Sequence, residues 1–148
     1  MKISTKGRYG LRILLDLAVH ENDAPRLIRD IARSQQLSEK YIGRLILELR
    51  NAGMVKSIRG AKGGYRLARP PQEISVLSII EIMEGPVRLV DCVQNPTYCE
   101  RSLQCAAHDI WMQLNAKIKE SLAAVTLQDI IGRYHRRNAD DGIFDYCI

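Results

Sequence analysis

Residues 37–53, LSEKYIGRLILELRNAG, determine how this chain folds. Apolar residues recur there every three or four positions, which is the spacing of a helix with one buried face. That face would consist of Ile42, Leu45, Ile46 and Leu49. Each such side chain contributes roughly 1.5–3 kcal/mol when fully buried, and together they outweigh the ~1 kcal/mol cost of Gly43 in a helix interior. Ser38 is placed to cap the N-terminus of the helix, and Gly53 suits the position after its C-terminus.

The next residues, MVKSIRGAKGGYRLAR over 54–69, predict a β-hairpin. Two short segments, 55–58 and 65–68, flank a loop with three glycines, which permit the positive φ angles of tight turns. Basic residues stand at the tip and its flanks, namely Arg59, Lys62 and Arg66. A phosphate-binding enzyme loop is the alternative, but the spacing of a P-loop is absent and a second strand follows.

Two further helices are predicted before residue 37. One has an apolar face formed by Leu11, Leu14, Leu15 and Ala18, and a shorter one, starting near Pro25, has a face formed by Ile28, Ile31 and Ala32. Two short helices joined by a tight turn and followed by a basic hairpin predict a winged helix-turn-helix. In that fold the helix after Ser38 enters the major groove of DNA, and Arg59 of the hairpin, or wing, probes the minor groove. A plain three-helix bundle is the alternative for the helices alone.

Charge is distributed unevenly along the chain, whose formal net charge is +5. Residues 1–69 contain fifteen lysine and arginine residues against six acidic ones, a net charge of +9. Residues 70–148 contain seven basic residues against eleven acidic ones, a net charge of −4. A basic N-terminal half predicts a polyanionic partner, most often nucleic acid, although a merely solvated basic surface is the alternative.

The sequence predicts a cytoplasmic protein without a membrane partner. No segment has the ~18–20 uninterrupted apolar residues that span a bilayer, and Asp16 interrupts the apolar stretch that could resemble a signal peptide. We also expect no enzyme activity, because the three histidines have no serine or aspartate partners at catalytic spacing; they are His20, His108 and His135.

The C-terminal half predicts a dimerisation region. After the linker RPPQE, a helix is expected from about Ser75 to Gly85, and a long helix from about Ala106. The apolar face of the long helix would comprise Trp111, Leu114, Ile118, Leu122 and Val125. Because the N-terminal unit leaves little chain to cover this face, we expect a second subunit there, with twofold symmetry that matches a palindromic DNA site. Packing against its own chain is the alternative.

These patterns divide the chain into three regions. Residues 1–69 form the predicted winged helix-turn-helix, and residues 70–134 form the dimerisation region, which includes a cysteine-rich loop at 86–105. A short helix is expected from Thr126, with Asp129 completing a capping box. Residues 135–148 show no sustained period and are predicted to form a flexible tail.

Three of the four cysteines share the loop in the pattern C-x6-C-x5-C-x2-H, formed by Cys92, Cys99, Cys105 and His108. Clustered cysteines in a cytoplasmic protein are more often metal ligands or redox groups than disulfides. Thiolate and imidazole donors suit an iron–sulfur cluster or zinc, and gaps longer than those of zinc knuckles favour the cluster. Reactive thiols that bind no metal, or a loop with no chemical role, are also compatible with this spacing. Cys147 is expected to take no part.

Together these motifs resemble the IscR/NsrR-type (Rrf-type) winged-helix iron–sulfur transcriptional regulators. The resemblance rests on STKGRYGLRILLDLA, SEKYIGRL, IRGAKGGYRLAR and the three cysteines followed by AAHDIW, and it covers residues 1 to about 134. It implies a homodimer that binds palindromic double-stranded operator DNA, with an affinity controlled by a bound [2Fe-2S] cluster that senses iron–sulfur, redox or nitric oxide status. The alternatives are a [4Fe-4S] cluster, zinc, a thiol–disulfide switch, or a cluster-free regulator of cysteine metabolism.

The resemblance also implies roles for particular residues. By position, DNA contacts fall on Ser38, Tyr41 and Arg44 of the helix and on Arg59 and Gly60 of the wing. The charges of Lys40 and Lys62 add to the same predicted surface. The implied cluster ligands are Cys92, Cys99, Cys105 and His108.

Two positions depart from the pattern of the family. The first two cysteines are one residue further apart than in the usual C-x5-C-x5-C, and Gly43 replaces an acidic residue that tunes the choice of DNA site. NsrR-like members can take an acidic ligand from near residue 8 of the partner subunit. Arg8 stands at that position here, which favours His108 as the fourth ligand.

Overall fold

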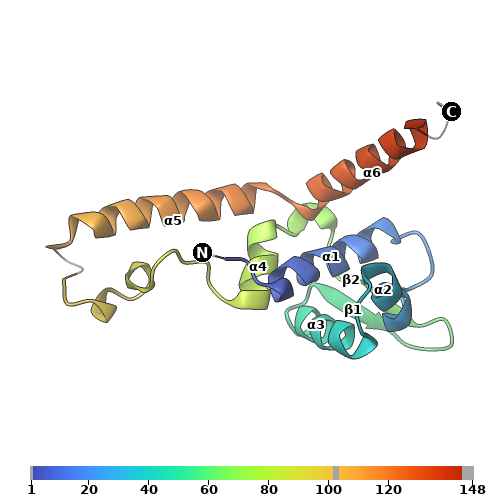
Figure 1. The fold of residues 1–148 in the computed structure, drawn as a ribbon. Helices are drawn as coiled ribbons and strands as arrows, with labels where there is room; N and C mark the ends of the chain where they lie inside the picture. Colours follow the sequence, from blue (N-terminus) through green and yellow to red (C-terminus); the bar gives the residue numbers. More distant parts are fainter. Residues whose placement is uncertain (1, 102–103, 145–148) are drawn as a thin grey trace.

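The computed structural model describes residues 2–101 and 104–144. Its order is α1 (Thr5–Val19), α2 (Ile28–Gln35), α3 (Glu39–Asn51), β1 (Val55–Ile58), β2 (Gly64–Leu67), α4 (Val76–Glu84), α5 (Ala106–Ala124) and α6 (Leu127–Phe144). Short 3₁₀ turns lie at Pro71–Glu73, Asp91–Val93 and Pro96–Tyr98. In Figure 1, α1–α4 and the antiparallel hairpin form one body, from which α5 and the cysteine loop extend to the left and α6 to the upper right. The predicted mainly helical, winged helix-turn-helix fold is confirmed.

Helix α3 has the ends and the buried face that the sequence predicts. The Ser38 hydroxyl accepts a hydrogen bond from the Tyr41 backbone N–H at 3.2 Å, which satisfies one of the free donors at the helix N-terminus. After the C-terminus, Gly53 adopts a φ of +73°, the left-handed conformation that glycine tolerates best. The four predicted core side chains are at most 1% exposed: Ile42, Leu45, Ile46 and Leu49.

Helix α2 begins at Ile28, three residues later than a start at Pro25 would place it. The reason is that Arg26 is paired with the wing instead. The Arg26 N–H donates to the Tyr65 carbonyl at 3.0 Å, and the Tyr65 N–H donates to the Arg26 carbonyl at 2.8 Å. This isolated bridge holds the segment before α2 in an extended conformation against β2.

A single hydrophobic core crosses the boundary expected after residue 69. Besides residues of α1–α3 and the hairpin, it contains Ile74, Ile79, Met83, Leu127 and Ile131. Helix α4 starts at the predicted Ser75 cap, whose hydroxyl accepts from the Ser78 N–H at 3.1 Å. The Leu127 N–H donates to the Ile74 carbonyl at 2.8 Å, which joins the start of α6 to the start of α4.

The C-terminus of α4 caps the N-terminus of α1. Glu84 Oε1 accepts hydrogen bonds from the Ser4 N–H and hydroxyl, both at 2.8 Å, and from the Gly7 N–H at 3.1 Å. A Cβ at Gly7 would collide with this carboxylate, so a larger residue there would displace the Glu84 side chain and its hydrogen bonds. The helix that leads into the cysteine loop is therefore attached directly to the first helix of the winged helix-turn-helix.

Helix α6 corrects the prediction of a tail without regular structure. The predicted capping box is present, because the Thr126 N–H and hydroxyl both donate to Asp129 Oδ2 at 2.8 Å. These bonds to Thr126 hold the pKa of the Asp129 carboxyl below its ordinary value of 3.8. The helix then continues to Phe144 because no proline interrupts it, and its second glycine, Gly142, lies only two residues from its end. Residues 145–148, with Cys147, lie outside the described residues.

Over residues 2–101 and 104–144, no helix has both the length and the apolar composition that crossing a membrane requires.

Candidate nucleic-acid interface and cysteine loop

The predicted basic residues of α3 lie on its exposed face. Lys40 and Arg44 are both exposed and are separated by one helical turn, so they project from the same side. Ser38 is also exposed, although its hydroxyl serves the N-cap. Across the described ranges, no acidic side chain forms an ion pair with Lys40 or Arg44. Their charge is therefore available to a phosphate backbone.

Tyr41 is held in place by α1. Its ring packs edge-on against Tyr9, with ring centroids 6.1 Å apart, and Arg12 lies over the Tyr9 ring at 5.3 Å. Tyr41 is consequently half-buried rather than fully exposed. A DNA contact from this position would come from a side chain that is already oriented by the protein.

Leu47 adds an apolar group to the exposed face of α3. It is 45% exposed, and it lies three residues after Arg44 and seven after Lys40, on the same side of the helix. An apolar side chain on a groove-facing helix can contact the methyl group of thymine. The only signal for it in the sequence is that Leu47 falls outside the three-and-four spacing of the buried face.

The wing presents its predicted residues at an exposed tip. Arg59, Gly60 and Lys62 are all exposed, and Gly60 has a φ of +106° at the turn. Arg66, also predicted to add charge here, instead donates its guanidinium hydrogen bonds to the carbonyl oxygens of Glu21 and Asp23. Arg66 therefore fixes the base of the wing to the α1–α2 turn.

Helix α3 and the wing form one continuous surface unit. Met54 lies immediately before β1, and its backbone N–H donates to the Leu49 carbonyl of α3 at 2.9 Å. Helix α3 also packs against β1. Figure 1 shows α3 and the hairpin together on the side of the body that faces away from α5 and α6. The helix and the tip of the wing are thus positioned relative to each other by short, hydrogen-bonded connections.

The cysteine loop brings His108 next to Cys92 but does not gather all the predicted ligands. Cys92, Cys99 and Cys105 are free cysteines, and Cys105 occupies the N-cap position of α5. His108 Nε2 lies 3.2 Å from the Cys92 carbonyl oxygen. Within 2–101 and 104–144, no three side chains of histidine, cysteine, aspartate or glutamate converge to hold a metal ion. The thiol and imidazole donors of the loop are of the kinds that bind an iron–sulfur cluster or zinc. To bind either one, the loop would have to change conformation so that its sulfur atoms come closer together.

Helix α5 is attached to its own chain along a narrow strip. Asn115 is its buried residue, and Asn115 Oδ1 accepts from the Leu89 N–H at 3.0 Å. Lys119 pairs with Glu81 of α4 at 3.1 Å. Much of the remaining surface of α5 is apolar and exposed, at Ile110, Trp111, Met112 and Leu114.

A helix-turn-helix, a wing, and exposed basic side chains on both define a winged-helix DNA-binding protein. The family model described as "Rrf2: Iron-dependent Transcriptional regulator" matches residues 3–133. The chain belongs to this Rrf2 family of transcriptional regulators, and the resemblance found in its sequence is confirmed at that level.

Individual relatives agree with the family assignment. The chain is 42% identical over 130 residues to the HTH-type transcriptional regulator CymR of Bacillus subtilis, covering 88% of this chain and 89% of CymR. The solved structure of CymR, described as the global cysteine regulator of B. subtilis, matches with a TM-score of 0.76 over 90% of this chain and 98% of CymR, at 41% identity. The structure of T. potens IscR matches with a TM-score of 0.72 at 38% identity, covering 90% of this chain and 88% of IscR.

Proposed function

We propose that this regulator is a homodimer that reads palindromic double-stranded DNA with α3 and the wing of each subunit. The observation that carries the proposal is the joint exposure of basic side chains on α3 and the wing, on one rigidly connected surface. Contacts to phosphate would supply affinity and its salt dependence, and α3 would discriminate bases in the major groove. The proposed contacts are Ser38, Lys40, Tyr41 and Arg44 of α3, and Arg59, Gly60 and Lys62 of the wing.

The exposed apolar face of α5 supports the homodimer. Ile110 is 57% exposed, Met112 43%, Leu114 42% and Trp111 39%. Ile110, Trp111 and Leu114 lie within about 100° of one another around the helix, whereas Met112 projects from its other side, so these three form an exposed apolar face of the kind typical of an interaction surface. A second copy of the same helix, related by a twofold axis, would cover this face and give the two α3 helices the symmetry of a palindromic site. A cytoplasmic location follows from this role.

We further propose that a [2Fe-2S] cluster, held by Cys92, Cys99, Cys105 and His108, controls operator affinity. The support is the donor chemistry of the loop, the description of the family as iron-dependent, and the similarity to an IscR. Bound there, the cluster would supply a centre that responds to iron–sulfur, redox or nitric oxide status.

The chain provides a route from this loop to the DNA-binding unit. The loop starts directly after Glu84, whose carboxylate caps the N-terminus of α1. A change in the loop that moves α4 would therefore move α1 as well. Coupling of ~1–3 kcal/mol through such a contact would alter DNA affinity about five- to 150-fold.

A cluster-free regulator of cysteine metabolism is the second candidate. It is favoured by the 42% identity to CymR and by the three free cysteines, which do not converge on a site within the described residues. Variants in the same loop are a [4Fe-4S] cluster, which differs in absorbance spectrum and in iron per subunit, zinc, which metal analysis detects, and a thiol–disulfide switch, which thiol titration before and after oxidation detects.

Anaerobic purification followed by absorbance spectroscopy and iron and sulfide analysis distinguishes these candidates. The cluster proposal expects visible absorbance and equal amounts of iron and sulfide, both lost in Cys99→Ala and both kept in the control Cys147→Ala. Protein that contains no iron or sulfide, and that cannot be reconstituted with them, would favour the cluster-free candidate. A coloured Cys99→Ala variant would show that the ligand set is wrong.

A further inference from the structure

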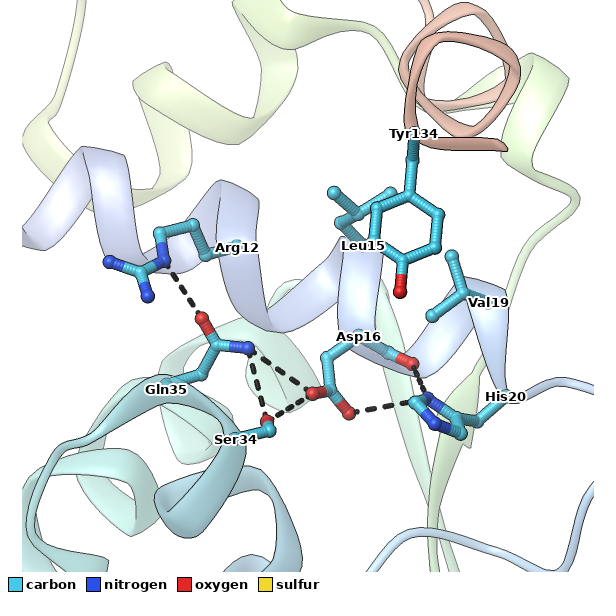
Figure 2. Close-up of a pocket in the computed structure, with 8 residues that line it drawn as sticks. All are labelled: Arg12, Leu15, Asp16, Val19, His20, Ser34, Gln35 and Tyr134. Carbon is cyan, nitrogen blue, oxygen red and sulfur yellow. Dashed lines mark hydrogen bonds and ion pairs between the residues drawn. The ribbon is translucent and has the colours of Figure 1, made fainter. Parts of the chain in front are cut away.

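A pocket of about 320 Å³ lies between α1, α2 and α6, apart from both the DNA-binding surface and the cysteine loop. Figure 2 shows that its lining comes from residues on all three helices. Pockets that bind small molecules usually span about 300–1,000 Å³, so this one suits a small ligand. Neither the proposed DNA contacts nor the proposed dimer uses it.

The floor of the pocket carries a carboxylate whose charge is already compensated. Asp16 is 6% exposed. Its Oδ1 accepts from Arg26 Nε at 2.9 Å, and its Oδ2 accepts from Gln35 Nε2 at 3.2 Å and from the Ser34 hydroxyl. Because this carboxylate is paired with an arginine and hydrogen-bonded on both oxygens, it needs no cationic ligand to neutralise its charge.

The rim of the pocket carries the positive charge of Arg12, whose guanidinium also lies over the Tyr9 ring at 5.3 Å. Arg12 is exposed, and its Nε donates to Gln35 Oε1 at 2.8 Å. Among the described residues, the terminal nitrogens of Arg12 have no hydrogen-bond or ion-pair partner. With Arg26 balancing Asp16, Arg12 leaves this site with a net positive charge, which favours an anion.

His20 stands at the other end of the pocket with one ring nitrogen in use. His20 Nδ1 lies 2.8 Å from the backbone carbonyl of Asp16. A carbonyl oxygen can only accept, so Nδ1 donates this hydrogen bond, and Nε2 takes no part in it. Between the two ends, Leu15, Val19 and the ring of Tyr134 form an apolar wall (Figure 2).

We propose that this pocket binds a small aliphatic monocarboxylate. The planar guanidinium of Arg12 matches a carboxylate with two parallel hydrogen bonds, and the short apolar body of the ligand would lie against Leu15, Val19 and Tyr134. The bound molecule would touch both the helix-turn-helix and α6, which follows the proposed dimerisation helix. It would thereby restrain the position of α6 on the DNA-binding unit.

Saturation-transfer difference NMR tests ligand binding to the full chain in the absence of DNA. Its result is therefore independent of whether the DNA-binding proposal is correct. The probes are butyrate, isobutyrate and isovalerate. We expect binding of at least one probe, weakened at least about tenfold in Arg12→Gln, as the loss of a charge-assisted pair predicts. Arg29→Gln, which changes an exposed arginine elsewhere on α2, serves as the matched control and should bind like the wild type.

A second variant keeps the test decisive if Arg12→Gln does not fold, which circular dichroism would reveal. Val19→Phe fills the apolar side of the pocket without altering its charge and should also abolish binding. Failure of all three probes to bind the wild type would overturn the proposal. So would binding that survives unchanged in a folded Arg12→Gln or Val19→Phe protein.

Discussion

Removing the buried carboxylate of Asp16 should destabilise the protein by about 3 kcal/mol. The side chain of Asp16 is 4% exposed and that of its partner Arg26 is 19% exposed, with Oδ1 and Nε 2.9 Å apart. Deleting one member of a buried ion pair typically costs about 3–5 kcal/mol, because the other charge is left uncompensated. Arg26 retains some access to water, which places Asp16→Ala at the lower end of that range. The Ser34 and Gln35 side chains lose an acceptor as well.

Urea unfolding followed by far-UV circular dichroism measures this loss, at a fixed subunit concentration because dimerisation contributes to apparent stability. Asp23→Ala, which removes an exposed carboxylate nearby, is the control and should change the unfolding free energy by less than about 0.5 kcal/mol. A double-mutant cycle with Arg26→Met should give a coupling of about 1–3 kcal/mol. A loss below about 1 kcal/mol for Asp16→Ala, or strictly additive effects in the cycle, would show that this ion pair does not stabilise the fold.

Three further predictions address the DNA surface, the dimer and the capping box. Arg59→Ala should weaken binding to an operator selected from random duplexes by about 1–3 kcal/mol, measured by fluorescence anisotropy; unchanged affinity would remove the wing from the interface. Trp111→Glu should convert the dimer to monomers in sedimentation velocity, because it places a charge in the proposed apolar interface; a persistent dimer would locate the interface elsewhere. Asp129 has a lowered pKa in the folded state, so its stabilising contribution is present above pH 3.8 and is lost as the pH falls through the lowered value. The difference in melting temperature between the wild type and Asp129→Asn should therefore vanish in strong acid, and a difference that is independent of pH would contradict this origin.

The features that the sequence predicts correctly are those with local signals. Ser38 and Gly53 mark the ends of α3 because capping depends on neighbouring backbone groups, and the spacing of Ile42, Leu45, Ile46 and Leu49 identifies its buried face without knowledge of the partner. The hairpin is likewise predicted by a glycine-rich loop between two short segments, although β2 begins and ends one residue earlier than predicted.

The features that the sequence does not predict depend on contacts between distant residues. Pro25 suggests an early start for α2, but Arg26 is paired with Tyr65, nearly forty positions later. Nothing in the local pattern shows that Glu84 caps α1 or that Leu127 and Ile131 join the core of the DNA-binding unit. The continuation of α6 past residue 135 is missed for a different reason, since a helix needs no apolar stripe where it is exposed to solvent.

In the cysteine loop, the spacing of residues along the chain predicts which side chains could be ligands but not whether they come together. The pattern from Cys92 to His108 identifies suitable donors, and the structure places His108 beside Cys92. Spacing along the chain does not determine whether sulfur atoms meet in space, because the described residues between Cys92 and Cys105 (93–101 and 104) form short 3₁₀ turns rather than a rigid helix or strand.

In the proposed mechanism, a centre in the cysteine loop controls DNA binding through α4 and α1. The most direct test measures the affinity of anaerobically purified protein for its selected operator. This affinity is measured before and after iron is removed by chelation, both in the wild type and in Cys99→Ala. We predict a change of about five- to 150-fold in the wild type and no change in the variant. Equal affinities of the iron-loaded and iron-depleted wild-type protein would contradict the mechanism.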